Sequence, residues 1–235
     1  MKKSILFLFI GYTLNLFGQE RLTLDHLASK YTLSSFERFK KLLSIPNDAN
    51  DKIGIQKNIE WAEKEFGKRG FSVSKIITKG EPLLLAKRDF TSKGKTVLIY
   101  LQMDGQPVDP SKWNQKSPYS PVLKKKNSSA DWEAINWQKI YEYNDDWRIF
   151  ARSSSDAKGP VSMFIAAIDA IDENGITPNF NIKVILDFEE EMGSPNLPDA
   201  VKKNGELLTS DVLIILDGPR HRLNKPTLTF GARGI

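Results

Sequence analysis

The sequence predicts an α/β fold in which a mixed, mainly parallel sheet has helices on both faces. Three continuous apolar runs, at residues 96–101, 182–186 and 212–216, have the composition of strands buried on both sides. Helical patterns alternate with these runs, and such alternation is typical of parallel or mixed sheets covered by helices. Each run is closely followed by acidic residues, which places a candidate site at one edge of the sheet.

Each expected element has its own signal. Leu and Phe recur at helical spacing up to Leu43, and Pro46 ends that helix. Gly70 follows the second helix closely, as a C-terminal cap does. Residues 106–147 are rich in Pro, Trp, Lys, Asn and Asp without a sustained period, which indicates a long surface excursion. The helices are expected at residues 22–43, 52–66, 161–171 and 198–203, and the strands at 71–77, 82–86, 96–101, 181–188 and 212–216.

The first 18 residues have the order of a secretory signal peptide. Two lysines precede an apolar stretch from Ile5 to Phe17, and the small Gly18 follows. The apolar stretch is short for a transmembrane helix, although a retained N-terminal membrane anchor is the alternative interpretation. We therefore expect cleavage near Gly18, export to the periplasm or the extracellular space, and no stable membrane span afterwards.

Composition excludes several classes of site. The 235 residues include no Cys, so disulfides, catalytic thiolates and cysteine-based zinc sites are excluded. The net charge is +5, but Lys and Arg are scattered among acids and the densest run is only residues 124–126, so we expect no nucleic-acid partner. His26 and His221 are the two histidines. A metal site must therefore depend on carboxylates.

Acidic residues follow all three strong strands. Asp104 follows the first, residues 189–191 are Glu-Glu-Glu after the second, and Asp217 follows the third. Asp156 stands at the start of a predicted helix. Carboxylates that share a site repel one another unless solvent or a cation intervenes. Their meeting at the ends of neighbouring strands predicts a site for a hard cation or zinc.

Four spaced motifs resemble one known enzyme family. They are residues 100–109 (YLQMDGQPVD), 152–160 (RSSSDAKGP), 188–197 (FEEEMGSPNL) and 216–217 (LD). In this order they resemble the co-catalytic zinc metallopeptidases that include carnosinase-type dipeptidases, bacterial glutamate carboxypeptidase and aminoacylase. The resemblance runs from about Phe36 to Ile235, and residues 226–234 look like the strand by which the family enters its lid domain.

The resemblance implies a hydrolase that cleaves the amide bond of a dipeptide or an N-acyl amino acid with metal-activated water. It implies two zinc ions per site, with manganese or cobalt possible, and a homodimer formed through the lid. Asp156 would bridge the two ions, Glu191 would complete the protein ligands of one and Asp217 those of the other. Glu190 would be the general base. Glu189 is expected to be solvated or to cap a helix, and Asp187 to be a buried acid without an assigned role.

Two features depart from the family pattern. Gln102 stands where the family has its first histidine ligand, so an amide oxygen would replace imidazole, and Asp104 would orient Gln102 instead of that histidine. The family's last histidine ligand lies downstream of the lid, and His221 has no counterpart in the motif. Residues 22–235 are accordingly expected to form the N-terminal part of the catalytic domain, a truncated form without the lid.

Two alternatives remain open from the sequence. The substitution at Gln102 also fits a catalytically inactive truncated homologue that acts as a binding module, or a gene fragment. Strand-end aspartates also serve magnesium-dependent phosphohydrolases, although no glycine-rich loop that would cradle a phosphate is evident. Metal stoichiometry separates the enzyme from the binding module.

Overall fold

The computed structural model describes residues 23–141, 144–218 and 227. Its main sheet contains five strands in the order β1-β2-β7-β3-β8. β3 runs parallel to both β7 and β8, whereas β2 is antiparallel to both β1 and β7. The predicted mixed sheet is confirmed. Its strands are β1 (Ser72–Ile76), β2 (Leu83–Arg88), β3 (Thr96–Gln102), β7 (Asn181–Asp187) and β8 (Val212–Ile215).

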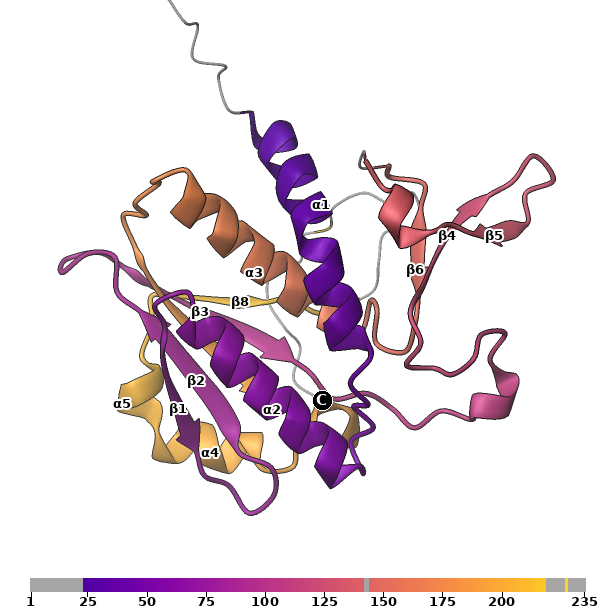
Figure 1. Ribbon diagram of the computed structural model, residues 1–235. Coiled ribbons are helices and arrows are strands. Elements are labelled where there is room, and N and C mark those ends of the chain that lie inside the picture. Colours follow the sequence, from indigo (N-terminus) through magenta and orange to yellow (C-terminus); the bar gives the residue numbers. More distant parts are fainter. Residues whose placement is uncertain (1–22, 142–143, 219–226, 228–235) are drawn as a thin grey trace, which may run out of the picture.

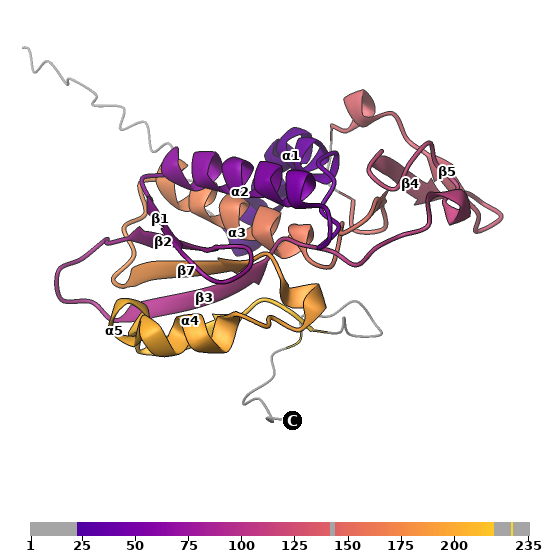
Figure 2. The ribbon, with the colours of Figure 1, turned by 90° about the horizontal axis from the view of Figure 1, so that it is seen from below.

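Helices cover both faces of this sheet, as expected. Three long helices lie together on one face, and two short ones lie on the other (Figure 2). The first group is α1 (Leu24–Leu43), α2 (Lys52–Gly67) and α3 (Lys158–Glu173), and the second is α4 (Leu197–Lys203) and α5 (Gly205–Leu208). The helix α5 was not predicted, because four residues are too few to show a helical period.

The two faces of the sheet explain why its strands are continuous apolar runs. Leu84 and Val184 pack into the larger hydrophobic cluster, together with residues of α1, α2 and α3. Leu85 and Ile185, their neighbours in the chain, pack into the smaller cluster with residues of α4 and α5. Successive side chains of a strand point to opposite faces, so both sets are apolar where both faces are covered.

The long segment after β3 contains a second sheet that the sequence analysis did not predict. Its strands are antiparallel in the order β5-β4-β6, and they extend away from the main body (Figure 1). With three to five residues each, they are too short to show alternation. Trp132 packs edge-on against Phe150 with ring centroids 5.2 Å apart. The strands are β4 (Val122–Lys126), β5 (Trp132–Ala134) and β6 (Arg148–Phe150). The same segment contains the 3-10 turns η1 (Pro110–Lys112) and η2 (Trp137–Lys139), and a third turn, η3 (Glu190–Met192), follows β7.

The predicted signal peptide lies outside the described residues, so its structure is not addressed. Among the helices of the described part, none combines the length and the apolar character that crossing a bilayer requires.

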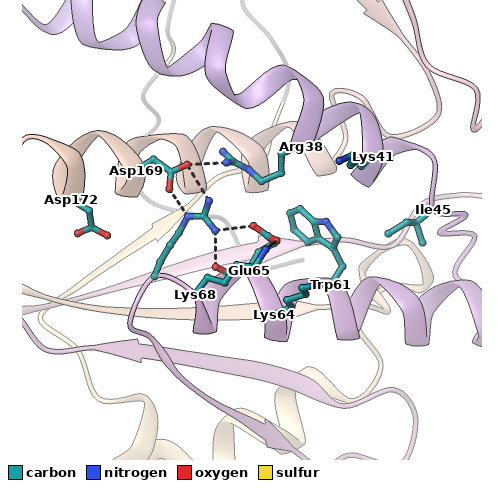
Figure 3. Close-up of a pocket in the computed structure, with 10 residues that line it drawn as sticks. Arg38, Lys41, Ile45, Trp61, Lys64, Glu65, Lys68, Asp169 and Asp172 are labelled. Carbon is teal, nitrogen blue, oxygen red and sulfur yellow. Dashed lines mark hydrogen bonds and ion pairs between the residues drawn. The ribbon is translucent and has the colours of Figure 1, made fainter.

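A network of ion pairs joins the three helices of the larger layer. Asp169 of α3 accepts hydrogen bonds from Arg69 Nε (2.6 Å) and Nη2 (3.1 Å), and its Oδ2 lies 2.9 Å from Nη1 of Arg38 in α1. Glu65 of α2 accepts from Arg69 Nη1 at 2.9 Å. The network lines a pocket of about 660 Å³, into which Trp61 also projects (Figure 3). These groups therefore connect α1, α2 and α3 directly.

The pKa of Glu65 makes the network sensitive to acid. Burial by itself would raise this pKa, but hydrogen bonds and charges from Lys68 and Arg69 outweigh burial and lower it below 4.5. A carboxyl group whose pKa is lowered by folding contributes stability above its unfolded-state pKa and loses it as the pH falls through the folded-state pKa. We therefore expect the Glu65→Gln variant to be less stable than wild type at pH 7, with the difference shrinking toward pH 3. Urea unfolding of both proteins at the two pH values measures this, and a difference independent of pH would contradict it.

Candidate active site

Parallel strand pairing brings the predicted acidic segments to one edge of the sheet. Gln102 at the end of β3 is in register with Asp187 of β7, and Tyr100 of β3 with Ile215 of β8. The three strands therefore end side by side, as expected from their apolar runs. The residues that follow them lie at this shared edge: Asp104 after β3, residues 189–191 after β7 and Asp217 after β8.

Gln102 and Asp104 are buried and each has an oxygen without a partner. Their exposed fractions are 3% and 1%. Asp104 Oδ2 accepts a hydrogen bond from the backbone N–H of Glu191 at 3.0 Å, whereas Asp104 Oδ1 and Gln102 Oε1 have no hydrogen-bond partner among the described residues. Burial, and then the charge of Asp187, raise the pKa of Asp104 to about 6, against backbone hydrogen bonds that lower it.

The amide of Gln102 faces Asp156. Gln102 Nε2 lies 3.5 Å from Asp156 Oδ1, so residues 54 positions apart meet at the end of β3. Asp156 is exposed at the entrance to α3, and the peptide bond between Asp156 and Ala157 is cis. The sequence analysis expected Asp104 to hold Gln102 through an amide N–H. Instead, Asp104 binds the turn after β7, and the amide N–H of Gln102 points to Asp156.

The start of α3 is held by a lysine that the sequence analysis did not single out. Lys158 is completely buried, and its Nζ donates to the backbone carbonyl oxygens of Leu42 (3.0 Å) and Ile45 (2.6 Å). Leu42 is in the last turn of α1, where a cation is favoured, and Ile45 lies just after the helix. Lys158 therefore ties α3 to α1 two residues after Asp156. No sequence pattern predicts this contact, because more than 110 residues separate its partners.

Asp187, to which the sequence analysis gave no role, organises the turn after β7. Its carboxylate accepts hydrogen bonds from Tyr100 Oη (3.0 Å), Ser194 Oγ (2.7 Å) and the backbone N–H of Glu189 (3.0 Å). Burial and the charge of Asp187 raise the pKa of Tyr100 well above its usual range, so the phenol remains a donor. Gly193 closes the turn with a φ of 81°, a conformation that favours glycine.

Glu189 is not solvated and caps no helix, so both of its expected roles are wrong. Its exposed fraction is 8%, and its Oε2 accepts a hydrogen bond from Asn196 Nδ2 at 2.7 Å. It makes no side-chain capping bond to the following 3-10 turn. The side chain of Glu189 is therefore buried against Asn196.

Burial and the charges of the other predicted acids raise the pKa of Glu190. Burial is the largest cause that raises its pKa to about 7, followed by the charges of Asp217, Glu191, Asp104 and Asp156. The charges of these acids therefore reach Glu190, although Asp156 and Asp217 are exposed.

Arg152 is a further member of the site that the sequence analysis missed. Its Nη2 lies 3.8 Å from Glu191 Oε1, and its buried Nε has no partner among the described residues. Arg152 is the first residue of the motif at 152–160, and that position was the available signal. A guanidinium beside Glu191 offsets part of the negative charge that the carboxylates bring together.

The donors at this edge have the chemistry of a cation site. In the described ranges, no three His, Asp or Glu side chains are arranged closely enough to hold a metal ion, so binding would require Asp156, Glu191 and Asp217 to move closer together. The unpaired buried oxygens of Gln102 and Asp104 are acceptors that a cation would satisfy. Oxygen donors of this kind suit divalent cations, and the residues therefore fit such a group.

Of the two histidines, only His26 belongs to the described residues, and it lies away from the ends of β3, β7 and β8. His26 is exposed in the first turn of α1, where its backbone N–H donates to Thr23 Oγ1 at 3.2 Å. It is a surface residue, as expected. His221 lies outside the described residues.

Comparison with known proteins agrees with the motifs. The model of the peptidase family M20/M25/M40 matches residues 98–227. The Cys-Gly metallodipeptidase of Schizosaccharomyces pombe is 28% identical over 215 residues, covering 84% of this chain and 40% of the yeast protein. A cysteinylglycine-S-conjugate dipeptidase of Corynebacterium striatum is 38% identical over 90 residues, covering 38% of this chain and 20% of that protein.

Solved structures show the same fold. The M20 family metallo-carboxypeptidase of Sulfolobus solfataricus superposes with a TM-score of 0.65 at 30% identity, over 82% of this chain and 39% of that one. Human carnosine dipeptidase 1 also gives a TM-score of 0.65, at 20% identity, over 83% of this chain and 41% of its own. The chain thus spans about two fifths of the length of these relatives. The family model covers more than half of the 235 residues, and the chain belongs to the peptidase family M20/M25/M40.

Proposed function

We propose that this protein is a metal-dependent dipeptidase that hydrolyses the amide bond of a dipeptide with two divalent cations, zinc being the cation that the family resemblance implies. The observation that carries the proposal is that β3, β7 and β8 end side by side and are each followed by predicted acids, with Gln102 Nε2 3.5 Å from Asp156 Oδ1 at this edge. A dipeptide substrate is supported by relatives named as a Cys-Gly metallodipeptidase and, in human, as a beta-Ala-His dipeptidase.

In this proposal each residue at this edge of the sheet has a separate role, either as a metal ligand or as the general base. Asp156, which faces Gln102, would hold both cations, with Glu191 on one and Asp217 with Gln102 on the other. The cations would lower the pKa of a water molecule and polarise the substrate carbonyl. Glu190 would take the proton of that water and then pass it to the leaving amine.

Metal stoichiometry with dipeptide hydrolysis tests the proposal. Metal-free protein, prepared with a chelator, is expected to take up about two zinc ions per chain, to gain hydrolysis of Cys-Gly or another dipeptide, and to lose it again on chelation. Calorimetric titration and amine release measure the two effects. A folded chain that binds no divalent cation would contradict the proposal.

A second candidate function, a binding module without catalysis, is favoured by one observation. Gln102 occupies the position of the family's first histidine ligand and pairs with Asp156 through its amide N–H. A chain that binds a dipeptide but takes up no metal would support this function over the hydrolase.

We also propose that the protein is exported and acts in the periplasm or outside the cell, with residues 1–18 as its signal peptide. The support is the charged, apolar and small-residue order of that segment. N-terminal sequencing of the protein from its source cells should show Gln19 as the first residue, whereas an intact Met1 would contradict cleavage. In the same proposal residues 22–235 form the N-terminal part of the catalytic domain. The family resemblance further implies a homodimer formed through the lid domain.

A further inference from the structure

The amide of Gln102 is buried with its oxygen unsatisfied. The side chain is 3% exposed, and Oε1 has no hydrogen-bond partner among the described residues. An unsatisfied buried acceptor destabilises the fold, because it has given up its hydrogen bonds to water. A cation that coordinates this oxygen would satisfy it, and in the present conformation the amide nitrogen is the atom that faces Asp156.

The amide of Gln102 can have one orientation in the metal-free protein and another in the metal-bound protein. The oxygen and nitrogen of a Gln amide have nearly the same shape, so rotation of the terminal group by half a turn exchanges them. Nε2 now lies 3.5 Å from Asp156 Oδ1, and after rotation Oε1 would occupy its place. Two ligands of one divalent cation, each about 2.1 Å from it, lie about 3 Å apart. Gln102 can therefore donate to Asp156 without a cation and share a cation with it otherwise.

The donor chemistry of this position differs from that of a histidine site. Gln102 would supply an amide oxygen, and Asp156 and Asp217 would supply carboxylate oxygens. Within the described residues His26 is the one histidine, and it lies at the start of α1. Imidazole favours zinc, whereas carboxylate and carbonyl oxygens suit manganese and magnesium.

We infer that Gln102 narrows the preference for Zn²⁺ over Mn²⁺ at the cation position that the proposed function assigns to Gln102, Asp156 and Asp217, because an amide oxygen takes the place of imidazole there. The inference rests on the proposed function, because it concerns one of the two cation positions named there. The protein would thus be a hydrolase with two unlike positions, of which one accepts a hard cation more readily than the other.

The test compares the wild-type chain with the Gln102→His variant, without any assay of activity. Mn²⁺ binding is followed by electron paramagnetic resonance, and Zn²⁺ is added as a competitor and titrated by calorimetry. Imidazole at position 102 is expected to raise the ratio of Zn²⁺ to Mn²⁺ affinity at this position at least 10-fold. Gln138→His, the same change at an exposed residue of η2, is the control and should leave the ratio unchanged.

Circular dichroism melting checks that each variant is folded. If His does not fit at the buried position, Gln102→Glu keeps the shape and adds a charged oxygen, and it is expected to strengthen Mn²⁺ binding several-fold. If both positions prefer Zn²⁺ and the Gln102→His substitution leaves the ratio of Zn²⁺ to Mn²⁺ affinity unchanged, the inference is overturned. The proposed function would remain intact. Folded proteins that bind no divalent cation at all would overturn both.

Discussion

The Glu190→Gln variant is expected to lose dipeptide hydrolysis by about 10²–10⁴-fold, the usual contribution of a general base. Glu190 lies among the predicted ligands, and four surrounding acids perturb its carboxylate. The amide keeps the shape of the side chain but cannot accept the proton of the attacking water. The loss is expected in kcat, whereas the number of cations bound per chain should stay at the wild-type value. Steady-state kinetics with calorimetric titration measures both quantities.

Glu189→Gln is the matched control for this prediction. The two glutamates are adjacent and the substitution is identical, but Glu189 is buried against Asn196. A Gln at position 189 can still accept that hydrogen bond through its amide oxygen, so the variant should keep most of the wild-type kcat. If Glu190→Gln retained more than a tenth of the wild-type rate, Glu190 would not be the general base.

The second large effect is expected on stability, from the Asp169→Ala variant. Asp169 is the acceptor that joins Arg38 of α1, and Arg69 just after α2, to α3. Arg38 already has two buried nitrogens without a partner among the described residues, so the variant would leave its guanidinium unpaired. Breaking a buried ion pair from one side costs about 3–5 kcal/mol. Because these side chains keep 12–20% exposure, we expect about 3 kcal/mol.

Asp172→Ala, one turn further along α3, supplies the comparison. Asp172 pairs with Arg88 through two hydrogen bonds of 2.8 Å, but its side chain is 35% exposed. Exposed pairs contribute at most about 1 kcal/mol, so this variant should unfold close to the wild-type urea midpoint. Equal losses of unfolding free energy in the two variants would show that burial does not decide the strength of the Asp169 network.

Much of the fold was predictable because its signals are local. The runs at residues 96–101, 181–188 and 212–216 were identified as strands, and the structure has β3, β7 and β8 there. Helical spacing and Pro46 located α1 to within a few residues of its observed bounds. The strands β4, β5 and β6 were missed, because short strands on an exposed sheet need not alternate polar and apolar residues.

The site was predictable at the level of segments, and less so at the level of side chains. The parallel register of β3 with β7 and β8 confirms that the three strands end side by side, whereas the meeting of the acids that follow them in one site stays a prediction. Among three consecutive glutamates, the sequence offered no local signal that Glu189 would turn inward to Asn196. The family resemblance selected Glu190 and Glu191, and their catalytic and ligand roles remain predictions.

By itself the sequence determined the class of fold, the family and the segments that form the site, because periodicity and motif spacing are properties of neighbouring residues. Only the tertiary structure decided which side chains meet. Tyr100 and Ser194 anchor Asp187, Lys158 binds the end of α1, and the amide of Gln102 turns its N–H toward Asp156. Each buried polar group takes its partner from whatever the packed helices and strands bring within hydrogen-bonding distance. Such partners lie up to more than a hundred residues away in the chain, beyond the reach of any local pattern.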